Sequence, residues 1–327
     1  MRVTAPGRVN LIGDHTDYTG GLVFPMAIDR YTSIDYERTD THVSLQSDDV
    51  AGTVSFDVRD AFDSAMEPSW GRYVAAVASQ IDAPLGITGR IATTIPVGAG
   101  LSSSAALELA AAVAMGSTAP PTQLALLAQR AEQMATGVPT GIMDQLCIAS
   151  ARAGHGTLID CHTLEVTQVP IPTDISIVVR FIAHRTLVGS EYGERVAQCQ
   201  AAEAIIGPLR LASLQALDVI DDEVVRSRAH HVISENQRVR DFSTALSTGD
   251  YVGAGAIMID GHHSLSTRFH TSTPQMDEAV REMNAVPGVY GARMTGGGFG
   301  GCIVALCTPT NELDGWRVAP SGPPTTA

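Results

Sequence analysis

The side chains best suited to chemistry lie in one short charged segment near the N-terminus. Residues 7–18 have the sequence GRVNLIGDHTDY and include Arg8, Asp14, His15, Asp17 and Tyr18. Carboxylates accept hydrogen bonds and imidazole both donates and accepts, so the group suits a ligand with several hydroxyls. The alternative interpretation is a solvated turn with local ion pairs, such as Arg8 with Asp14.

A second candidate is the glycine- and serine-rich segment 96–105, PVGAGLSSSA. It follows a predicted strand over 86–95 and precedes a predicted helix over 102–115. Backbone amides at a helix start attract anions, glycines allow close approach, and hydroxyls offer oxygen to Mg²⁺. The segment lacks the GxxxxGK[ST] pattern, and all 21 basic residues of the chain are arginine. It predicts a phosphate loop, with a polar helix cap as the alternative.

A third candidate is the carboxylate of Asp144, which lies among apolar residues in the sequence TGIMDQ. A buried carboxylate needs a partner such as an arginine. Phosphoryl transfer needs a positioned hydroxyl, a carboxylate to orient or deprotonate it, and cations for the developing charge. Asp144 with Arg8 meets these needs, whereas a helix N-cap or an ordinary surface acid is the simpler alternative.

A dense run of glycines stands near the end of the chain, where residues 291–302 have the sequence GARMTGGGFGGC. Flexible linkers rarely contain Arg, Met and Phe or lead directly into a β-strand. The run therefore predicts a structured loop that closes a site, although a linker is the usual interpretation of such a composition.

Hydrophobic periodicity and turn residues predict the elements that position these segments. Short β segments are expected in 1–60, including 41–46, and strand-and-turn structure in 155–169. Helices are expected over 121–136, from near 139, and over 191–206, 224–247 and 273–284. A strand pair follows around 288–306, and the Pro- and Thr-rich tail 320–327 is expected to be loosely held.

Composition narrows the functional classes. The 327-residue chain has a net charge of −14 with scattered acids, which argues against a nucleic-acid surface. It has no apolar run of the roughly 20 residues that a membrane helix needs and no signal-like start, so a cytoplasmic protein is expected. The five cysteines are expected to be buried thiols, and His230, His231, His262 and His263 to be exposed helix residues.

Taken in order, these segments resemble the GHMP small-molecule kinase superfamily, and galactokinases in particular. The resemblance covers nearly the whole chain, because it continues through 141–145, 158–161 and 287–294. It implies an α+β fold with an N-terminal lobe over 1–170, a C-terminal lobe over 171–327 and the active site between them. It also implies transfer of phosphate from ATP, with Mg²⁺, to a galactose-like sugar, at the anomeric hydroxyl if the sugar is galactose.

The resemblance assigns roles to individual residues. Asp144 matches the catalytic aspartate and Arg8 the arginine beside it. The positions that contact the sugar are Asp14, His15, Asp17, Gly141 and Tyr192. The nucleotide positions are Trp70, Gly98, Gly100, Leu101, Ser102, Ser103 and Ser104. Trp70 falls where the family stacks an aromatic ring on adenine, and Ser104 or Ser103 with Glu132 resembles the Mg²⁺ site.

Two departures from the family pattern affect the choice of substrate. Asp14 stands where the signature has a longer Glu, and the run 180–185, RFIAHR, replaces a usual Ser-Asn pair and His. A kinase for another sugar or a cyclitol is therefore a second hypothesis. A non-catalytic sensor of sugar and ATP is a third, disfavoured because Arg8 and Asp144 are both present. The sequence does not indicate an oligomeric state.

Overall fold

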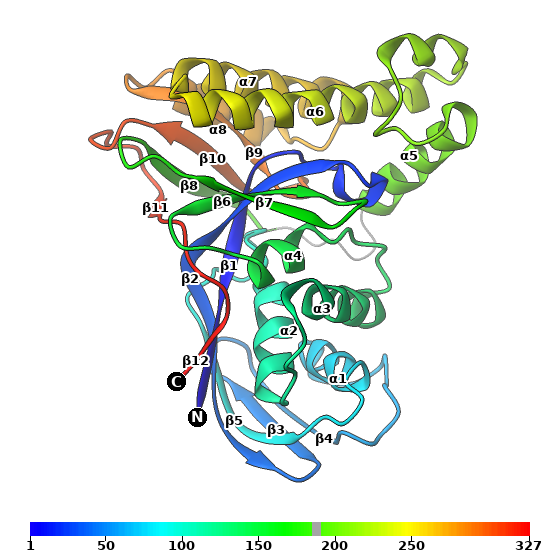
Figure 1. The fold of residues 1–327 in the computed structure, drawn as a ribbon, viewed down its shortest axis with the longest axis vertical. Helices are drawn as coiled ribbons and strands as arrows, with labels where there is room; N and C mark the ends of the chain where they lie inside the picture. Colours follow the sequence, from blue (N-terminus) through cyan, green and yellow to red (C-terminus); the bar gives the residue numbers. More distant parts are fainter. Residues whose placement is uncertain (185–190) are drawn as a thin grey trace.

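Two β-sheets organise the chain, and helices pack against both of them (Figure 1). The structure is a computed structural model that describes residues 1–184 and 191–327. The eight-stranded sheet contains β1 (Arg2–Ile12), β2 (Leu22–Thr39), β3 (His42–Ser47), β4 (Thr53–Asp57), β5 (Gly86–Thr93), β6 (His155–Asp160), β7 (Glu165–Pro170) and β12 (Thr325–Thr326). The four-stranded sheet has the order β11 (Trp316–Val318), β8 (Ser176–Ala183), β10 (Gly301–Cys307) and β9 (Val289–Thr295).

The helices form one group in the first half of the chain and another in the second half. The first group is α1 (Gly71–Ser79), α2 (Ser103–Ala114), α3 (Pro121–Thr136) and α4 (Met143–Ala149). Helices α1, α2 and α4 contact strands of the first sheet, and α3 packs on these three helices. Those in the second half are α5 (Tyr192–Ile206), α6 (Glu223–Thr248), α7 (Tyr251–Ser264) and α8 (Pro274–Asn284), with α7 and α8 against β9. Short helical turns are η1 (Asp17–Thr19), η2 (Leu214–Val219) and the π-helical η3 (Leu265–Phe269). This mixture confirms the predicted α+β fold.

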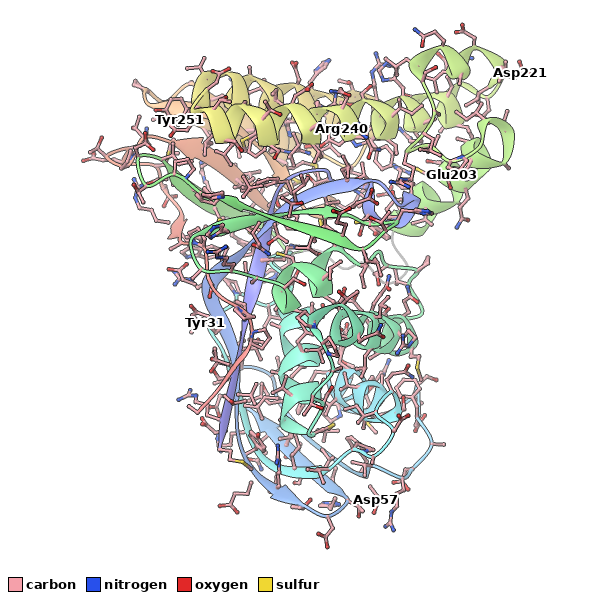
Figure 2. The ribbon with its side chains drawn as sticks, in the orientation of Figure 1. Tyr31, Asp57, Glu203, Asp221, Arg240 and Tyr251 are labelled. Carbon is pink, nitrogen blue, oxygen red and sulfur yellow. The ribbon has the colours of Figure 1, made fainter. Side chains whose placement is uncertain are left out.

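Side chains fill the space between these elements, and Asp57 and Asp221 lie at opposite ends of the molecule (Figure 2). The predicted lobe boundary near residue 170 stays a prediction. The strand β7 ends at Pro170 and β8 opens the second sheet at Ser176, but the C-terminal segment returns to the first sheet. In the described ranges, no helix combines the length and apolar character needed to cross a membrane.

The strands β1 and β2 are longer than the short segments that the sequence predicts. They pair antiparallel along most of β1, and residues 5–12 are all buried. Helices α2 and α4 from the first half of the chain and α6 and α7 from the second half all contact β1. Because side chains pointing both ways are covered, the alternation that marks a half-exposed strand is lost.

A β-bulge at Gly7 interrupts β1 next to the glycine- and serine-rich segment 96–105. The register shifts between Pro6 and Arg8, and a Cβ at Gly7 would stand only 2.6 Å from the carbonyl oxygen of Leu101. The close approach lets the Arg8 N–H donate to that carbonyl at 3.1 Å. Bulges re-aim side chains near functional sites, and this one joins Arg8 to the glycine-rich segment.

Helix prediction succeeded where caps and periodicity were strong. Helix α3 has the predicted bounds, because Pro121 starts it and Gly137, with φ of 70°, ends it. Helix α7 was predicted only in part, because His262 and His263 were expected in a helix but no bounds were assigned, and its three glycines weaken the helical signal. Two of them are required by packing: a Cβ at Gly255 would overlap the backbone at Tyr290, and one at Gly261 would approach Nη1 of Arg293.

The C-terminal tail is held by the first sheet, contrary to the loose tail that its composition predicts. Thr325 and Thr326 pair with β1, and the N–H groups of Arg2 and Ala327 each donate to the other's carbonyl at 2.9 Å. Nearer the start of the tail, the N–H of Ser321 donates to the carbonyl of Ala27 at 2.9 Å. Backbone pairing, which composition does not report, fixes this segment.

Removal of residues 319–327 is expected to lower thermal stability, because these backbone bonds to β1 and β2 are lost. Four such bonds are lost: two between Arg2 and Ala327, one from Ser321 to Ala27 and one from Asp29 to Ala319. At about 1 kcal/mol each, a loss of about 4 kcal/mol is expected, and at about 2–4 °C per kcal/mol for a large domain the Tm should fall by roughly 8–16 °C. Removal of 324–327 alone should have a smaller effect, since it spares the contacts of residues 319–321. Calorimetry of both truncations is the measurement, and an unchanged Tm in the longer truncation would contradict the structural role.

Candidate active site

A cavity of about 390 Å³ is lined by residues from both halves of the chain. Tyr192, Gly296 and Gly297 come from the second half and the remaining lining residues from the first. Apart from Leu101, the predicted site residues all line it, namely Arg8, Asp14, His15, Asp17, Trp70, Gly98, Gly100, Ser102, Ser103, Ser104, Glu132, Gly141, Asp144 and Tyr192. Groups that are far apart in the sequence therefore face a common space.

The centre of the cavity wall is a bidentate ion pair between Arg8 and Asp144. Arg8 Nε donates to Oδ1 at 2.6 Å, and Nη2 donates to Oδ2 at 2.7 Å. The hydroxyl of Ser102 also donates to Oδ2. The Arg8 side chain is 3% exposed but that of Asp144 is 23% exposed, so the carboxylate remains accessible from the cavity. Arg8 pairs with this distant acid and not with Asp14, which excludes the local pair considered from the sequence.

The predicted phosphate loop lies against this ion pair and leads into α2. Gly98 and Gly100 both have φ of 75°, in the left-handed region that glycine adopts at little cost. Arg8 Nη1 donates to the carbonyl of Gly100 at 2.7 Å. Leu101 is buried, and its carbonyl accepts the N–H of Arg8, so it supports the loop from behind. The start of the 12-residue helix α2 thus faces the cavity, where an anion would be favoured.

Glu132 is held from three directions beside the loop. The hydroxyls of Ser104 and Thr140 donate to it at 2.8 and 3.0 Å, and the amide of Gln145 donates at 3.0 Å. Burial, followed by repulsion from Asp144, raises its pKa. Carboxylate and hydroxyl oxygens are the ligand types that Mg²⁺ prefers.

The excess of carboxyl groups around the guanidinium of Arg8 also favours the binding of a divalent cation. The carboxyls of Asp17, Glu108, Glu132 and Asp144 interact electrostatically with one another or with the guanidinium of Arg8. In residues 1–184 and 191–327, no three His, Cys, Asp or Glu side chains form a ready-made metal cluster. Such a partial ligand set suits Mg²⁺ that keeps phosphate and water oxygens as its other ligands.

Asp17 faces Gly141 across the pocket and carries a strongly perturbed carboxyl. A Cβ at Gly141 would overlap Oδ2 of Asp17, so only glycine leaves room for this carboxylate. Burial raises the pKa of Asp17 to about 7, and repulsion from Asp144 adds to the effect. A carboxyl with this pKa changes its hydrogen-bonding character near neutral pH.

Aromatic rings surround His15 on the same wall. Its ring centroid lies 5.5 Å from that of Tyr192 and 4.7 Å from that of Phe269, and its Nδ1 lies 3.0 Å from the hydroxyl of Tyr18. His15 has φ of 66°, so the backbone turns sharply to bring the ring into this cluster. Phe269, in the π-helical η3, was not predicted, and the sequence offered no local signal for it.

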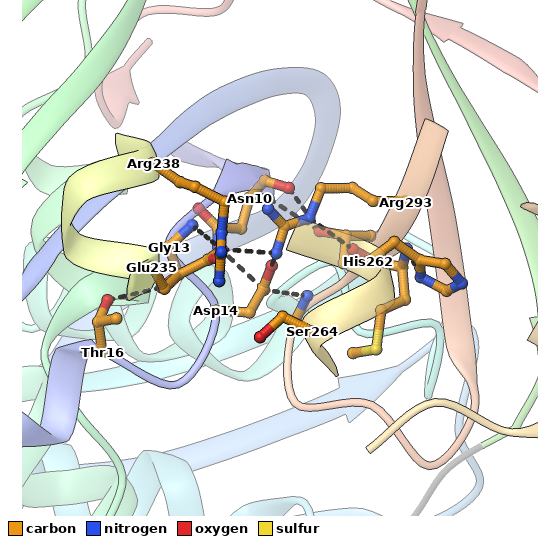
Figure 3. Close-up of polar contacts among 12 residues, drawn as sticks. Asn10, Gly13, Asp14, Thr16, Glu235, Arg238, His262, Ser264 and Arg293 are labelled. Atoms are coloured by element: carbon orange, nitrogen blue, oxygen red, sulfur yellow. Dashed lines mark hydrogen bonds and ion pairs between the residues drawn. The ribbon is translucent and has the colours of Figure 1, made fainter. Parts of the chain in front are cut away.

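Asp14 belongs to a sealed polar network that links the two halves of the chain (Figure 3). Its Oδ1 accepts from the Asn10 amide at 2.9 Å and the Gly296 N–H at 2.7 Å, and its Oδ2 accepts from Arg293 at 2.8 Å. The same Arg293 nitrogen donates to Glu235 at 2.8 Å. Asp14 is 1% exposed and Arg293 fully buried, so the glycine strip is fixed to the N-terminal segment.

The network shifts the pKa values of its two carboxyls in opposite directions. Burial raises the pKa of Asp14 in spite of Arg293. Burial also opposes ionisation of Glu235, but Arg293 and Arg238 outweigh it and hold the pKa of Glu235 well below its usual range. Glu235 also accepts the N–H of Gly13 at 3.0 Å, which anchors the turn that carries Asp14.

Two of the four histidines expected to be exposed are buried next to this network. His231 is fully buried, with Nε2 at 3.2 Å from the Asp14 carbonyl and Nδ1 at 2.8 Å from the Ser264 hydroxyl. Burial lowers its pKa to about 4, so it is neutral at pH 7. His262 is 8% exposed and accepts the N–H of Met294. All five cysteines are buried thiols, as expected.

Several structurally important residues were missed by sequence reasoning. Arg293 stands inside the predicted glycine strip, and Gln145 directly follows Asp144, so both had a positional signal. Glu108 is an acid in an alanine-rich helix, which is itself a sign of a buried polar role. Arg185, part of the departing run 180–185, lies outside the described residues.

Three family models match the chain. They are the galactokinase galactose-binding signature over residues 1–36, the GHMP kinases N terminal domain over 72–152 and the GHMP kinases C terminal over 242–315. The galactokinase of Chloroflexus aggregans is 41% identical over 332 residues, covering 92% of this chain and 82% of that protein. The human galactokinase is 38% identical, covering 94% of this chain and 83% of that protein.

Comparison with solved structures points to the same family as these relatives. Lactococcus lactis galactokinase, crystallised with galactose, superposes with a TM-score of 0.88 at 29% identity, covering 100% of this chain and 95% of that chain. A mevalonate kinase structure, at 18% identity and a TM-score of 0.69, shares the fold. The cavity, its motifs and these similarities lead to one conclusion: the chain belongs to the GHMP kinases and, within them, to the galactokinase family.

Proposed function

We propose that the cavity phosphorylates the anomeric hydroxyl of galactose, or the matching hydroxyl of a close analogue, with ATP as the donor. As a member of the galactokinase family, the protein is an ATP-dependent sugar kinase. The observation that carries the assignment to this cavity is the Arg8–Asp144 pair, with its accessible carboxylate between a sugar-type wall and a phosphate-type loop.

Asp144 is the group that orients the acceptor hydroxyl and takes its proton. Two nitrogens of Arg8 and the hydroxyl of Ser102 hold the carboxylate in one orientation. Its exposed part then faces the hydroxyl, whose oxygen attacks the terminal phosphorus of ATP while the bond from that phosphorus to the bridging oxygen of ADP breaks. The hydroxyl proton passes to a carboxylate oxygen of Asp144, and ADP leaves. Because little covalent chemistry is required of the protein, this positioning is its main contribution together with electrostatic stabilisation.

The sugar lies against the wall formed by Asp14, His15, Asp17, Gly141 and Tyr192. Asp17 is partly buried but lines the cavity, so its carboxyl can accept hydrogen bonds from sugar hydroxyls, whereas Asp14 shapes the far end. The nucleotide occupies the side lined by Trp70, which stacks on adenine, and by the loop residues Gly98, Gly100, Ser102, Ser103 and Ser104, with Leu101 supporting the loop. Lobes over 1–170 and 171–327 meet at this cavity in our assignment.

Glu132 with Ser104, or with Ser103 beside it, would hold Mg²⁺. When bound, Mg²⁺ neutralises negative charge on the transferred phosphate. The protein's own part is to present an oxygen ligand that is already oriented by Thr140 and Gln145. The acidic excess around Arg8 supports this assignment.

A second candidate is a kinase for another sugar or a cyclitol, and one observation favours it. Three donors, from Asn10, Gly296 and Arg293, already occupy the short carboxylate of Asp14. A carboxylate occupied in this way reaches less far toward a substrate than the longer Glu of the family signature. The far end of the substrate is therefore the position at which this chain should differ in selectivity.

The first test is ATP consumption with Mg²⁺ against galactose, its amino and uronic relatives, pentoses and cyclitols. Turnover of galactose is expected, and turnover of a cyclitol or another sugar alone would move the protein to the second candidate. Asp144→Asn is expected to lower kcat by about 10²–10⁴-fold. Asp57→Asn, at the far end of the first sheet, is the control. If Asp144→Asn kept most of the turnover, the base role would be wrong, and sugar binding without turnover in the wild type would indicate a sensor.

The pKa of Asp17 predicts a pH dependence of sugar use. Below about pH 7 the carboxyl gains a proton and loses an acceptor, so kcat/KM for the sugar is expected to fall by up to about tenfold per pH unit. Asp17→Asn should lower kcat/KM and flatten this acidic limb. A pH profile of both proteins is the measurement, and an acidic limb that persists in Asp17→Asn would assign the titration to another group.

The same pKa predicts a stability effect of opposite sign. The folded-state pKa of Asp17 is raised, so its contribution to stability is full at low pH and is lost as pH rises through about 7. Asp17→Asn removes this loss, and the sugar-free variant is expected to have a Tm about 2–4 °C above wild type at pH 8. The difference should shrink toward pH 4. Equal Tm values at both pH values would contradict the burial of an ionised Asp17.

The sealed network predicts a large loss of stability when its shared cation is removed. Arg293→Met leaves the buried carboxyls of Asp14 and Glu235 without their common partner, so a loss of about 3–5 kcal/mol is expected in urea unfolding. The triple variant with Asp14→Asn and Glu235→Gln should recover part of it, since the buried charges are then also removed. A loss below about 1 kcal/mol in the single variant would show that the network is not a stabilising link.

A further inference from the structure

A series of buried, hydrogen-bonded polar side chains lies behind Glu132, on the side away from the cavity. Glu108 and Gln145 are both fully buried, and neither lines the cavity. Nε2 of Gln145 donates to Oε2 of Glu132 at 3.0 Å and to Oε2 of Glu108 at 3.1 Å. One amide group therefore joins two carboxyls.

The positions of these residues along α2 and α4 explain how the hydrogen-bonded series Glu108–Gln145–Glu132 reaches the site. Ser104 and Glu108 are four residues apart on α2 and share one face of that helix. Gln145 directly follows Asp144 on α4. The amide of Gln145 therefore links Glu132, which accepts a hydrogen bond from Ser104 of the phosphate loop, to helix α4, which carries Asp144.

Such an arrangement is unfavourable unless it serves a purpose. Oε1 of Glu108 and Oε1 of Gln145 are buried without a hydrogen-bond partner among the described residues. Buried polar atoms are usually satisfied, and each exception reduces stability. Burial and repulsion from Glu132 also raise the pKa of Glu108 well above its usual range. Apolar side chains at 108 and 145 would avoid these penalties, so fold stability alone does not explain the pair.

We propose that Glu108 and Gln145 are positioning residues that hold the Glu132 carboxylate in the orientation that binds the metal–nucleotide complex. Glu108 fixes the amide of Gln145 by accepting one of its two N–H groups. The other N–H then points at Glu132, whose second oxygen is held by Ser104. This inference rests on the metal site proposed above and adds two residues that touch neither substrate nor phosphate.

The geometry specifies which substitutions should matter. Gln145→Met and Glu108→Met keep the approximate volume but remove, respectively, the donor to Glu132 and the acceptor that orients it. Glu108→Gln keeps an acceptor oxygen at the same place and is the conservative rescue variant. Leu109→Ala, at a buried apolar position next along α2, is the control for a general loosening of the helix.

The experiment is calorimetric titration of each full-length protein with ATP, once with Mg²⁺ and once with EDTA. In the wild type, Mg²⁺ should strengthen ATP binding. Gln145→Met and Glu108→Met should weaken Mg²⁺–ATP binding about tenfold, with metal-free ATP binding unchanged. Glu108→Gln and Leu109→Ala should both stay within about threefold of wild type. Steady-state kinetics should show a matching rise in KM for Mg²⁺–ATP with KM for the sugar unchanged.

The outcomes separate this inference from the proposed function. If the wild type binds ATP more tightly with Mg²⁺ but both methionine variants match it, the positioning role is overturned and the metal site stands. If ATP binding by Leu109→Ala weakens as much as that of the methionine variants, the effect is general loosening and the inference also fails. A wild type that phosphorylates sugar but binds ATP equally with and without Mg²⁺ overturns both the metal site and this inference. Should Gln145→Met fail to fold, Glu108→Met and its rescue by Glu108→Gln decide the question alone.

Discussion

The ion pair between Arg8 and Asp144 is the interaction on which the rest of the site depends. It joins β1, the phosphate loop and α4, since Arg8 also donates to the Gly100 carbonyl and Ser102 donates to Asp144. The bulge at Gly7 lies where the backbone of β1 closely approaches Leu101, and this approach brings Arg8 against the phosphate loop. A displacement of any of the three segments would therefore change the direction of the Asp144 carboxylate.

The surroundings of this pair are overloaded with acids, and that imbalance explains several features together. Burial and mutual repulsion raise the pKa values of Asp17, Glu108 and Glu132. Carboxyls held in this way oppose one another's ionisation and so reduce the stability of the fold near neutral pH. Strained electrostatics at functional sites commonly reflect such a compromise between stability and activity.

Much of the site was predictable because its signals are local. The glycine–serine loop before a helix, the acid among apolar residues at 144 and the charged run at 7–18 each have a recognisable spacing. The pairing of Arg8 with Asp144 followed from the chemistry that phosphoryl transfer needs, although the two are 136 positions apart. The pairing of Asp14 with Arg293, 279 positions away, could not be predicted from residue types. The burial of His231 and the pairing of the tail with β1 likewise depend on contacts between distant segments, which periodicity does not encode.

The two arginine-centred links of the cavity differ in a way that follows from their tasks. The Arg8–Asp144 pair is open on one side, with 23% of the Asp144 side chain exposed, as the role that we propose for Asp144 requires. The Asp14–Arg293–Glu235 link is sealed, with fully buried side chains. A sealed ion pair is worthwhile only where all its partners are fixed, and here it fixes Gly296 to Asp14. The Arg8–Asp144 link therefore keeps access to the cavity at the expense of isolation from water. The sealed link joins the N-terminal segment to the glycine strip, so it fixes the two halves of the cavity wall relative to each other.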